Sequence, residues 1–179
     1  MFSPLPLHAV RLSDPLFAPR IAALGTTGLP HQFRMIKESG RLENFLCVAR
    51  NERGSHVGRR YDDSDVYKWL EAVAYVLAHH PNPSLQTDAE TVISAIAAAQ
   101  AEDGYLNTFI QLQDPEARWT RLTDSHEVYC LGHLIEAGVA WKGALGDDRL
   151  LDVSVRAATL LERTRGENGL ASSDGHAEA

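Results

Sequence analysis

"DDSDVYKWLEAVAYVLAHHPNP", residues 62–83, indicates the fold class of the chain. The acidic residues that open it are suited to capping the amides at the positive end of a helix. His79 and His80 suit a solvated helix end, and the prolines after them end the helix. Between these limits, apolar residues recur at intervals of three and four, the spacing of one helix face: Val66, Trp69, Leu70, Val73 and Leu77.

Three further segments carry the same kind of pattern. Residues 84–100 predict a second helix, which "EDGYLNT" ends, and residues 124–143 and 149–163 predict a second pair joined by "GALGDD". The two pairs lie about sixty residues apart and read as a repeat. Helix pairs of this kind build an open solenoid or a closed ring around a cavity. The apolar stripe of the second helix consists of Leu85, Ala89, Val92, Ile93, Ile96 and Ala97.

The organisation of the chain is that of one all-α domain. Its 179 residues, 44% of them hydrophobic, suffice for one core, and no long stretch alternates with the period of a strand. Residues 1–60 hold most of the prolines and short apolar clusters that suit either a helix or an extended segment. We therefore expect a single domain over residues 1–179, with an irregular leader over residues 1–60 and helix pairs over residues 61–179.

Composition excludes several functions. The formal charge of -7, from 17 basic and 24 acidic residues, disfavours nucleic acid and anionic membranes as partners. No apolar run is long enough to span a bilayer and the first residues do not form a signal peptide, which favours a cytoplasmic location. A Gly-rich phosphate loop, a GxSxG elbow and a CxxC pair are all missing from the sequence, so kinase, dehydrogenase and serine-hydrolase interpretations lack support.

The segment "HEVYCLGH", residues 126–133, concentrates side chains that could do chemistry. It differs from the HExxH zinc motif because its fifth residue is Cys130. His126, Cys130 and His133 share a helix face, but the two histidines lie roughly 10 Å apart along the axis, too far for one zinc ion. We therefore predict that Cys130 and His133 pack in the core, and that Glu127 completes a capping arrangement with Asp124.

His126 occupies the first turn of its helix, where it can face the mouth of a cavity. A neutral imidazole both donates and accepts a hydrogen bond, which suits a sugar hydroxyl. Near the start of the earlier helix, Tyr61 and Asp65 belong to a cluster of carboxylates and aromatic rings. Sugar sites use such side chains, because rings stack on CH surfaces and carboxylates accept hydrogen bonds from hydroxyls.

Several segments together resemble a known family: "PLPLHAVRLSDPLFAPR", "DSDVYKWLEAVAY", "DGYLNT", "HEVYCLGHLIEAGVA" and "DGHAEA". In order and spacing they are similar to the N-terminal part of the catalytic domain of glycoside hydrolase family 127, the beta-L-arabinofuranosidases. The resemblance covers nearly the whole chain and implies part of an (α/α)6 barrel, incomplete here. It also implies a retaining glycosidase for terminal beta-L-arabinofuranosides or related sugars.

The resemblance further implies which residues contact the sugar. The histidine of the "HE" pair and that of the "DGH" turn map onto His126 and His176. We predict His126, His176, Tyr61 and Asp65 as substrate-binding residues. In the family a zinc-bound cysteine is the nucleophile, a glutamate is the acid and base, and cysteines with another glutamate hold Zn²⁺. These residues lie beyond the matched region, so we predict no catalytic residue and no metal ligand in this chain, which alone should be inactive.

Two other interpretations stay open. One is another helical-barrel sugar enzyme, resembling N-acylglucosamine 2-epimerase. Zinc held by cysteines in the full-length protein would argue against this interpretation. The other is a non-catalytic helical interaction module. A polar exterior would support this interpretation, whereas a large exposed apolar flank would argue against it. The predicted partner is a small carbohydrate, and the oligomeric state is unknown. "SSDGHAEA" at the end suggests the start of another helix and hence a piece of a longer domain.

Overall fold

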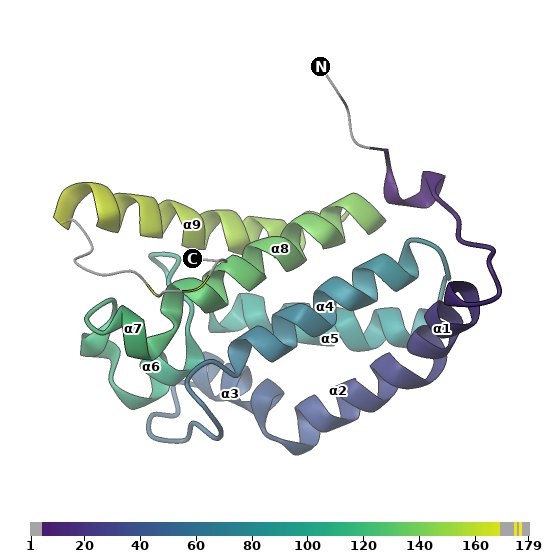
Figure 1. The fold of residues 1–179 in the computed structure, drawn as a ribbon. Coiled ribbons are helices and arrows are strands. Elements are labelled where there is room, and N and C mark those ends of the chain that lie inside the picture. The colour runs from purple at the N-terminus through teal and green to yellow at the C-terminus, as the bar shows by residue number, and fades with distance from the viewer. Residues whose placement is uncertain (1–4, 169–173, 175, 177–179) are drawn as a thin grey trace.

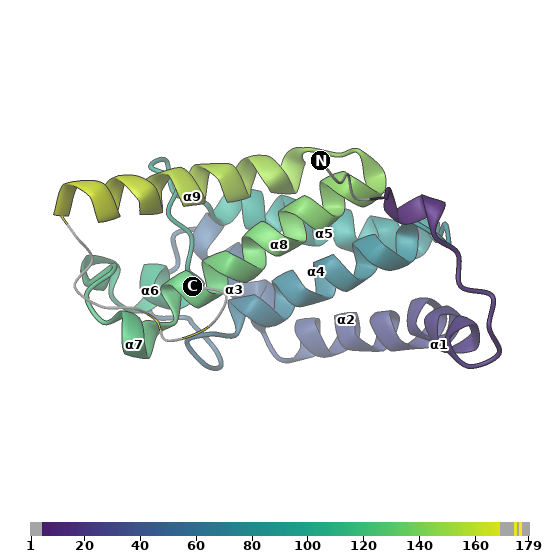
Figure 2. The same cartoon turned by 45° about the horizontal axis from the view of Figure 1, so that its top comes forward.

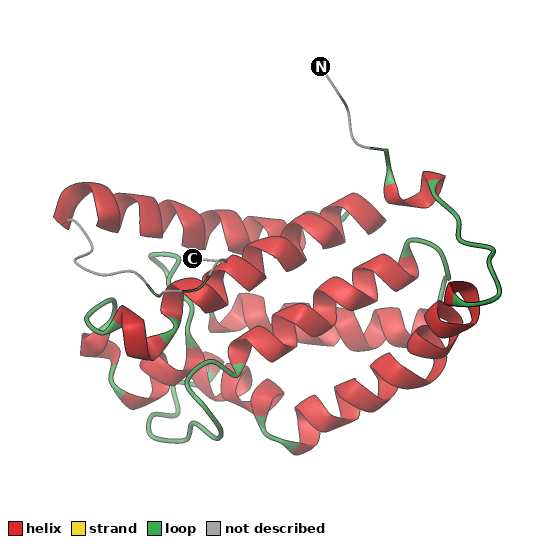
Figure 3. Cartoon of the chain, in the orientation of Figure 1, coloured by secondary structure: helices red, strands yellow, loops and turns green. Residues whose placement is uncertain are grey.

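The computed structural model describes residues 5–168, 174 and 176, and the described residues form helices joined by turns and loops without a strand (Figure 3). The helix suggested by "SSDGHAEA" lies outside the described residues. The elements follow one another as η1 (Leu7–Ala9), α1 (Phe17–Ala23), the π-helical turn η2 (Leu24–Gly28), α2 (Leu29–Glu38), α3 (Arg41–Ala49), α4 (Asp63–Leu77), α5 (Pro83–Ala99), α6 (Thr108–Gln113), η3 (Pro115–Ala117), α7 (Leu122–Ser125), α8 (Glu127–Leu145) and α9 (Arg149–Asn168).

Two helix pairs, α4 with α5 and α8 with α9, form the body of the molecule. α4 and α8 lie side by side and run in the same direction, while α5 and α9 run back along them (Figures 1 and 2). α3 packs against α5, so α3, α5 and α9 form a second layer behind α4 and α8. The amino ends of α4 and α8 therefore lie at the same end of the assembly, beside α6 and α7.

The predicted apolar stripe of α4 is confirmed. Val66, Leu70 and Val73 have no exposed surface, and Trp69 is 3% exposed. In α5 the stripe is confirmed except at Ala97, which is exposed. The core thus lies between the two helix layers, where each helix buries one face.

The expected irregular leader differs from the structure, because residues 17–49 are largely helical. Phe33 of α2 stacks on Trp69 of α4 with ring centroids 5.0 Å apart, and the Trp69 indole N–H donates to the Leu29 carbonyl at 3.0 Å. Gly40, with φ +80°, separates α2 from α3 in the left-handed conformation that glycine adopts readily. The helices of this segment are short and interrupted, so no single long periodic run reveals them in the sequence.

α8 and α9 approach closely at Gly138. A Cβ atom there would lie 2.5 Å from the Ser154 hydroxyl and 3.2 Å from the Leu150 carbonyl oxygen. The Ser154 hydroxyl also donates to the Leu134 carbonyl of α8 at 3.0 Å. This close approach, together with the hydrogen bond, holds α9 against α8.

Among the described residues, no helix is both long enough and apolar enough to cross a membrane.

Candidate functional site

The helix predicted over residues 124–143 is broken at His126, which joins α7 to α8. The backbone of His126 is left-handed, with φ 55° and ψ 33°, a conformation that residues other than glycine adopt rarely. Its carbonyl accepts the Cys130 amide at 3.0 Å, the first hydrogen bond of α8. The imidazole is thereby held at the amino end of α8, at the corner between two helices.

His126 and His176, which the family resemblance assigns to one sugar, lie side by side. Their ring centroids lie 4.9 Å apart. Nδ1 of His126 lies 3.0 Å from Oδ1 of Asp174, whose Oδ2 accepts the Tyr129 amide at 2.8 Å. The Asp174 side chain is fully buried and that of His126 is 22% exposed. The buried Asp174 carboxylate therefore contacts both the His126 ring and the first turn of α8.

Tyr129 lies at the centre of these rings. Its ring centroid is 4.6 Å from that of His176 and 5.9 Å from that of His126. From α4, the Lys68 ammonium donates to the Tyr129 hydroxyl and lies 4.8 Å from the ring centroid. We call His126, Tyr129, Asp174 and His176 the histidine cluster. It gathers a buried carboxylate, two imidazoles and a phenol, groups that hydrogen-bond hydroxyls and pack on a sugar ring.

Of the other two predicted sugar-binding residues, Tyr61 joins this cluster and Asp65 does not. The Tyr61 ring centroid lies 5.4 Å from that of His126, and its hydroxyl accepts from Arg59 Nη1 at 2.6 Å. Oδ2 of Asp65 accepts from Arg41 Nε at 2.9 Å, and the half-exposed side chain lines a separate cavity. The structure thus brings three of the four residues together and places Asp65 in a neighbouring hollow.

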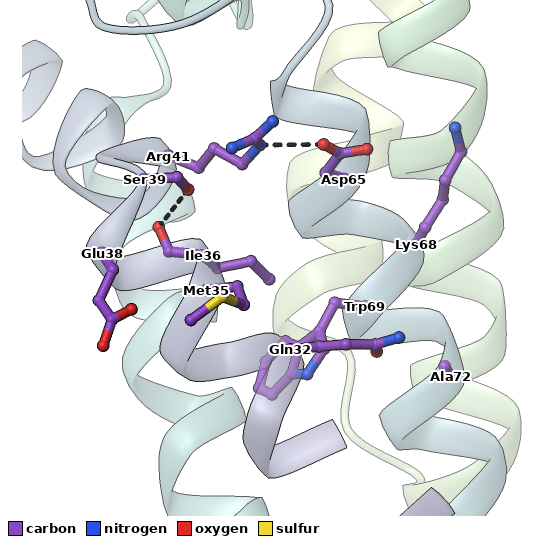
Figure 4. Close-up of a pocket in the computed structure, with 10 residues that line it drawn as sticks. All are labelled: Gln32, Met35, Ile36, Glu38, Ser39, Arg41, Asp65, Lys68, Trp69 and Ala72. Carbon is purple, nitrogen blue, oxygen red and sulfur yellow. Dashed lines mark hydrogen bonds and ion pairs between the residues drawn. The ribbon is translucent and has the colours of Figure 1, made fainter. Parts of the chain in front are cut away.

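That hollow is a cavity of about 760 Å³ between α2 and α4 (Figure 4). Figure 4 shows the Arg41–Asp65 pair at one end, with Met35, Ile36, Trp69 and Gln32 further along. Lys68 lines the same cavity, so this residue contacts both the cavity and the Tyr129 hydroxyl.

The predicted capping role of Glu127 with Asp124 is wrong. Asp124 lies in α7, and Glu127 is 2% exposed beneath it. Its carboxylate accepts from the Tyr105 hydroxyl, from the Trp119 amide at 3.0 Å and from the Ser125 hydroxyl at 2.6 Å. Burial, together with this carboxylate, raises the pKa of Tyr105 well above its ordinary value, so the phenol remains a donor. Glu127 therefore holds Tyr105, Trp119 and Ser125 against the amino end of α8, next to His126.

The acidic start of α4 also makes tertiary contacts. Asp62 occupies the N-cap position, but its side chain accepts from the Arg59 amide at 2.9 Å rather than from the helix. Asp63 is buried and accepts from both the amide and the hydroxyl of Thr108, at 2.7 and 2.6 Å. Burial raises the pKa of Asp63 to about 6, because desolvation outweighs the two hydrogen bonds. This carboxylate fixes the start of α4 against the start of α6.

Cys130 and His133 pack in the core, as predicted. Cys130 is 1% exposed, and burial, with the charge of Asp63 next in importance, raises the pKa of its thiol well above the ordinary value. Such a thiol is a poor nucleophile. Nδ1 of His133 lies 2.8 Å from Glu136, and its ring packs 4.7 Å from that of Tyr129.

Among the described residues, the two cysteines do not come together to form a metal site. Cys47 lies on α3 with its sulfur 3.4 Å from Arg50 Nη2, whereas Cys130 is buried on α8. His126, Asp174 and His176 could share an ion, since their ligand atoms lie within 4.8 Å of one another. Both Asp174 oxygens, however, already face the His126 ring and the Tyr129 amide, an arrangement of hydrogen bonds rather than of ligands about 2 Å from one ion.

Sequence reasoning missed Tyr129, Asp174 and Lys68. Tyr129 follows His126 by three residues, so helical spacing could have placed the two side chains together. Asp174 reaches His126 across 48 positions, and Lys68 reaches Tyr129 across 61. Nothing local in the sequence reveals contacts at such separations.

Parallel α4 and α8, each with a partner helix behind it, define a part of a helical barrel. The model of the family described as "Beta-L-arabinofuranosidase, GH127 catalytic domain" matches residues 9–173. The chain belongs to this family, as its sequence motifs indicated. Of the barrel enzymes considered from sequence, this match supports the glycoside hydrolase rather than the epimerase.

Individual relatives agree with this assignment. A non-reducing end beta-L-arabinofuranosidase of Bifidobacterium longum subsp. longum is 40% identical over 147 residues, which are 79% of this chain and 22% of that protein. A GH127 beta-L-arabinofuranosidase from Geobacillus stearothermophilus T6 superimposes with a TM-score of 0.89 at 39% identity, covering 94% of this chain and 28% of the other. A further GH127 beta-arabinofuranosidase gives 0.82 at 34% identity, covering 89% and 27%. The chain thus spans about a quarter of the length of these relatives, and the (α/α)-barrel fold is confirmed for this part.

Proposed function

We propose that this chain forms the pentose-binding part of a retaining glycoside hydrolase that removes terminal beta-L-arabinofuranosyl units. The observation that carries the proposal is the convergence of His126 and His176 around Tyr129, with Asp174 buried beneath them. The Bifidobacterium relative is a non-reducing end beta-L-arabinofuranosidase, which supports the choice of sugar.

Asp174 sets the hydrogen-bonding direction of His126. A carboxylate 3.0 Å from Nδ1 accepts the proton of that nitrogen, which leaves Nε2 as an acceptor for a sugar hydroxyl. The Tyr129 amide holds the other carboxylate oxygen, so the imidazole cannot rotate without breaking a buried hydrogen bond. The two imidazoles and the Tyr129 ring then offer the polar and apolar contacts that orient a furanose.

We further propose that the nucleophile, the acid and base, and any zinc ligands come from residues other than those described. Cys130 is a buried thiol with a raised pKa. Glu127 is buried and bonded to protein donors, and Asp174 holds His126 and Tyr129. A retaining glycosidase requires an acid and base together with a nucleophile, on opposite faces of the sugar. The chain by itself should therefore bind a pentoside without hydrolysing it.

The binding test is an NMR titration of the chain with methyl beta-L-arabinofuranoside. We expect the His126 and His176 ring signals to shift with a common dissociation constant, and His126→Ala to weaken binding about tenfold or more, since it removes a hydrogen bond and its orienting ring. His80→Ala, at the exposed end of α4, is the matched control and should leave affinity unchanged. Equal binding by the two variants would contradict the proposal.

The activity test uses the same chain and glycoside. Release of L-arabinose, followed by chromatography over a day, should not exceed that of buffer alone. Turnover by the purified chain that Cys130→Ala abolishes would disprove the assignment of catalysis to other residues.

A further inference from the structure

The cavity between α2 and α4 combines the two kinds of surface that saccharides need. Met35, Ile36 and Trp69 provide an apolar floor, and Met35 is 40% exposed. Gln32 and the Arg41–Asp65 pair add donors and acceptors along its length (Figure 4). Its volume of about 760 Å³ lies within the range typical of small-molecule sites. The cavity therefore has room for more than one sugar unit.

Lys68 joins this cavity to the histidine cluster. The side chain lines the cavity, and its ammonium donates to the Tyr129 hydroxyl. The Tyr129 ring packs against His176 and His126, so the Lys68 side chain lies between the cavity and the histidine cluster. The cavity and the histidine cluster are therefore neighbours across the Lys68 side chain.

We propose that the α2–α4 cavity binds the saccharide unit to which the terminal pentose is attached, which is the leaving group of the reaction. This inference rests on the proposed function, because it assumes that the pentose lies in the histidine cluster. Gln32 is the residue assigned to recognise the second unit, since its amide offers both a donor and an acceptor at the exposed edge. The enzyme then selects its substrates by the saccharide unit attached to the terminal pentose as well as by the pentose itself.

The charges of the lining favour a neutral polar ligand. The Arg41 guanidinium lies 2.9 Å from Asp65 and 3.3 Å from the buried Asp62, so its charge is balanced within the protein. The Lys68 ammonium points to Tyr129 rather than into the cavity. Glu38 also lines the cavity, where it is exposed and lies 4.0 Å from Arg34, and its carboxylate can accept hydrogen bonds from the hydroxyl groups of a neutral ligand.

The experiment compares two probes, methyl beta-L-arabinofuranoside and a beta-L-arabinofuranosyl disaccharide, by NMR titration of the chain. The inference predicts that the disaccharide binds several-fold more tightly and shifts the Trp69 indole N–H signal, whereas the monosaccharide shifts only the histidine cluster. Gln32→Ala should remove most of the difference between the probes and leave the affinity for the monosaccharide unchanged. Gln86→Ala, an exposed glutamine on α5, is the matched control.

The outcomes separate failure of this inference from failure of the proposed function. Equal affinity for both probes, with the Trp69 signal unmoved, overturns the inference and leaves the proposed function standing. A tighter disaccharide whose advantage survives Gln32→Ala also overturns it, since the second unit then lies elsewhere. Failure of both probes to shift the His126 and His176 signals overturns the proposed function and this inference together.

Discussion

The histidine cluster and the α2–α4 cavity adjoin each other but are held in place differently. Around the cluster, the carboxylates of Asp63, Glu127 and Asp174 are at most 5% exposed and accept hydrogen bonds from protein donors. At the cavity, the Arg41 and Asp65 side chains are 26% and 50% exposed. Buried hydrogen bonds are expensive to break, whereas exposed ion pairs contribute little. The first part is preorganised by the core, and the second can adapt at low cost.

Among these variants, Glu127→Ala should lower the free energy of unfolding the most. It leaves the Tyr105 hydroxyl, the Trp119 amide and the Ser125 hydroxyl without their acceptor, and we expect the free energy of unfolding to fall by about 3–5 kcal/mol. Urea denaturation followed by circular dichroism measures it. Glu116→Ala, exposed in η3, is the control and should stay within about 0.5 kcal/mol of the parent. A similar change in both variants would refute the structural role of Glu127.

Asp63 makes stability depend on pH. Its pKa is about 6 in the folded chain against an ordinary 3.8, so the folded state binds this proton more tightly. The resulting stabilisation is complete below pH 3.8 and is lost as the pH rises through 6. Relative to Asp63→Asn, the parent chain should lose on the order of 3 kcal/mol between pH 4 and 7. Denaturation at several pH values measures this, and Asp152→Asn, exposed on α9, should follow the parent.

Asp174→Asn should weaken pentoside binding about tenfold, because a neutral amide holds the His126 tautomer less firmly than a carboxylate. The ¹⁵N signals of the imidazole report the tautomer directly and should change in the same variant. Asp114→Asn, exposed after α6, should alter neither property. An unchanged His126 tautomer in Asp174→Asn would show that this carboxylate does not orient the ring.

The smallest effect is expected at the cavity edge. Asp65→Asn removes an exposed pair with Arg41 and should change the free energy of unfolding by about 0.2–1 kcal/mol. Urea denaturation under the conditions used for Glu127→Ala gives the comparison. A loss as large as that of Glu127→Ala would show that the two parts of the site are held equally firmly.

Much of this molecule could be predicted from local patterns. The stripe of α4 and most of that of α5 follow from helical spacing, since burial of one face leaves a periodic signal. The helices of residues 17–49 left no such signal, because each has ten residues or fewer and Gly40 separates α2 from α3. The convergence of His126 with His176 was inferred from family motifs and not from periodicity.

By itself, the sequence determined the helix pairs, the family, and the packed roles of Cys130 and His133. Only the tertiary structure showed that the His126 backbone is left-handed and that the buried Asp174 contacts its ring. It also showed that Asp65 lines the α2–α4 cavity instead of joining the histidine cluster. The physical reason is range. Helix faces arise from residues three or four positions apart, whereas a buried carboxylate finds its donors wherever the packed helices bring them, here across 45 and 48 positions of the chain.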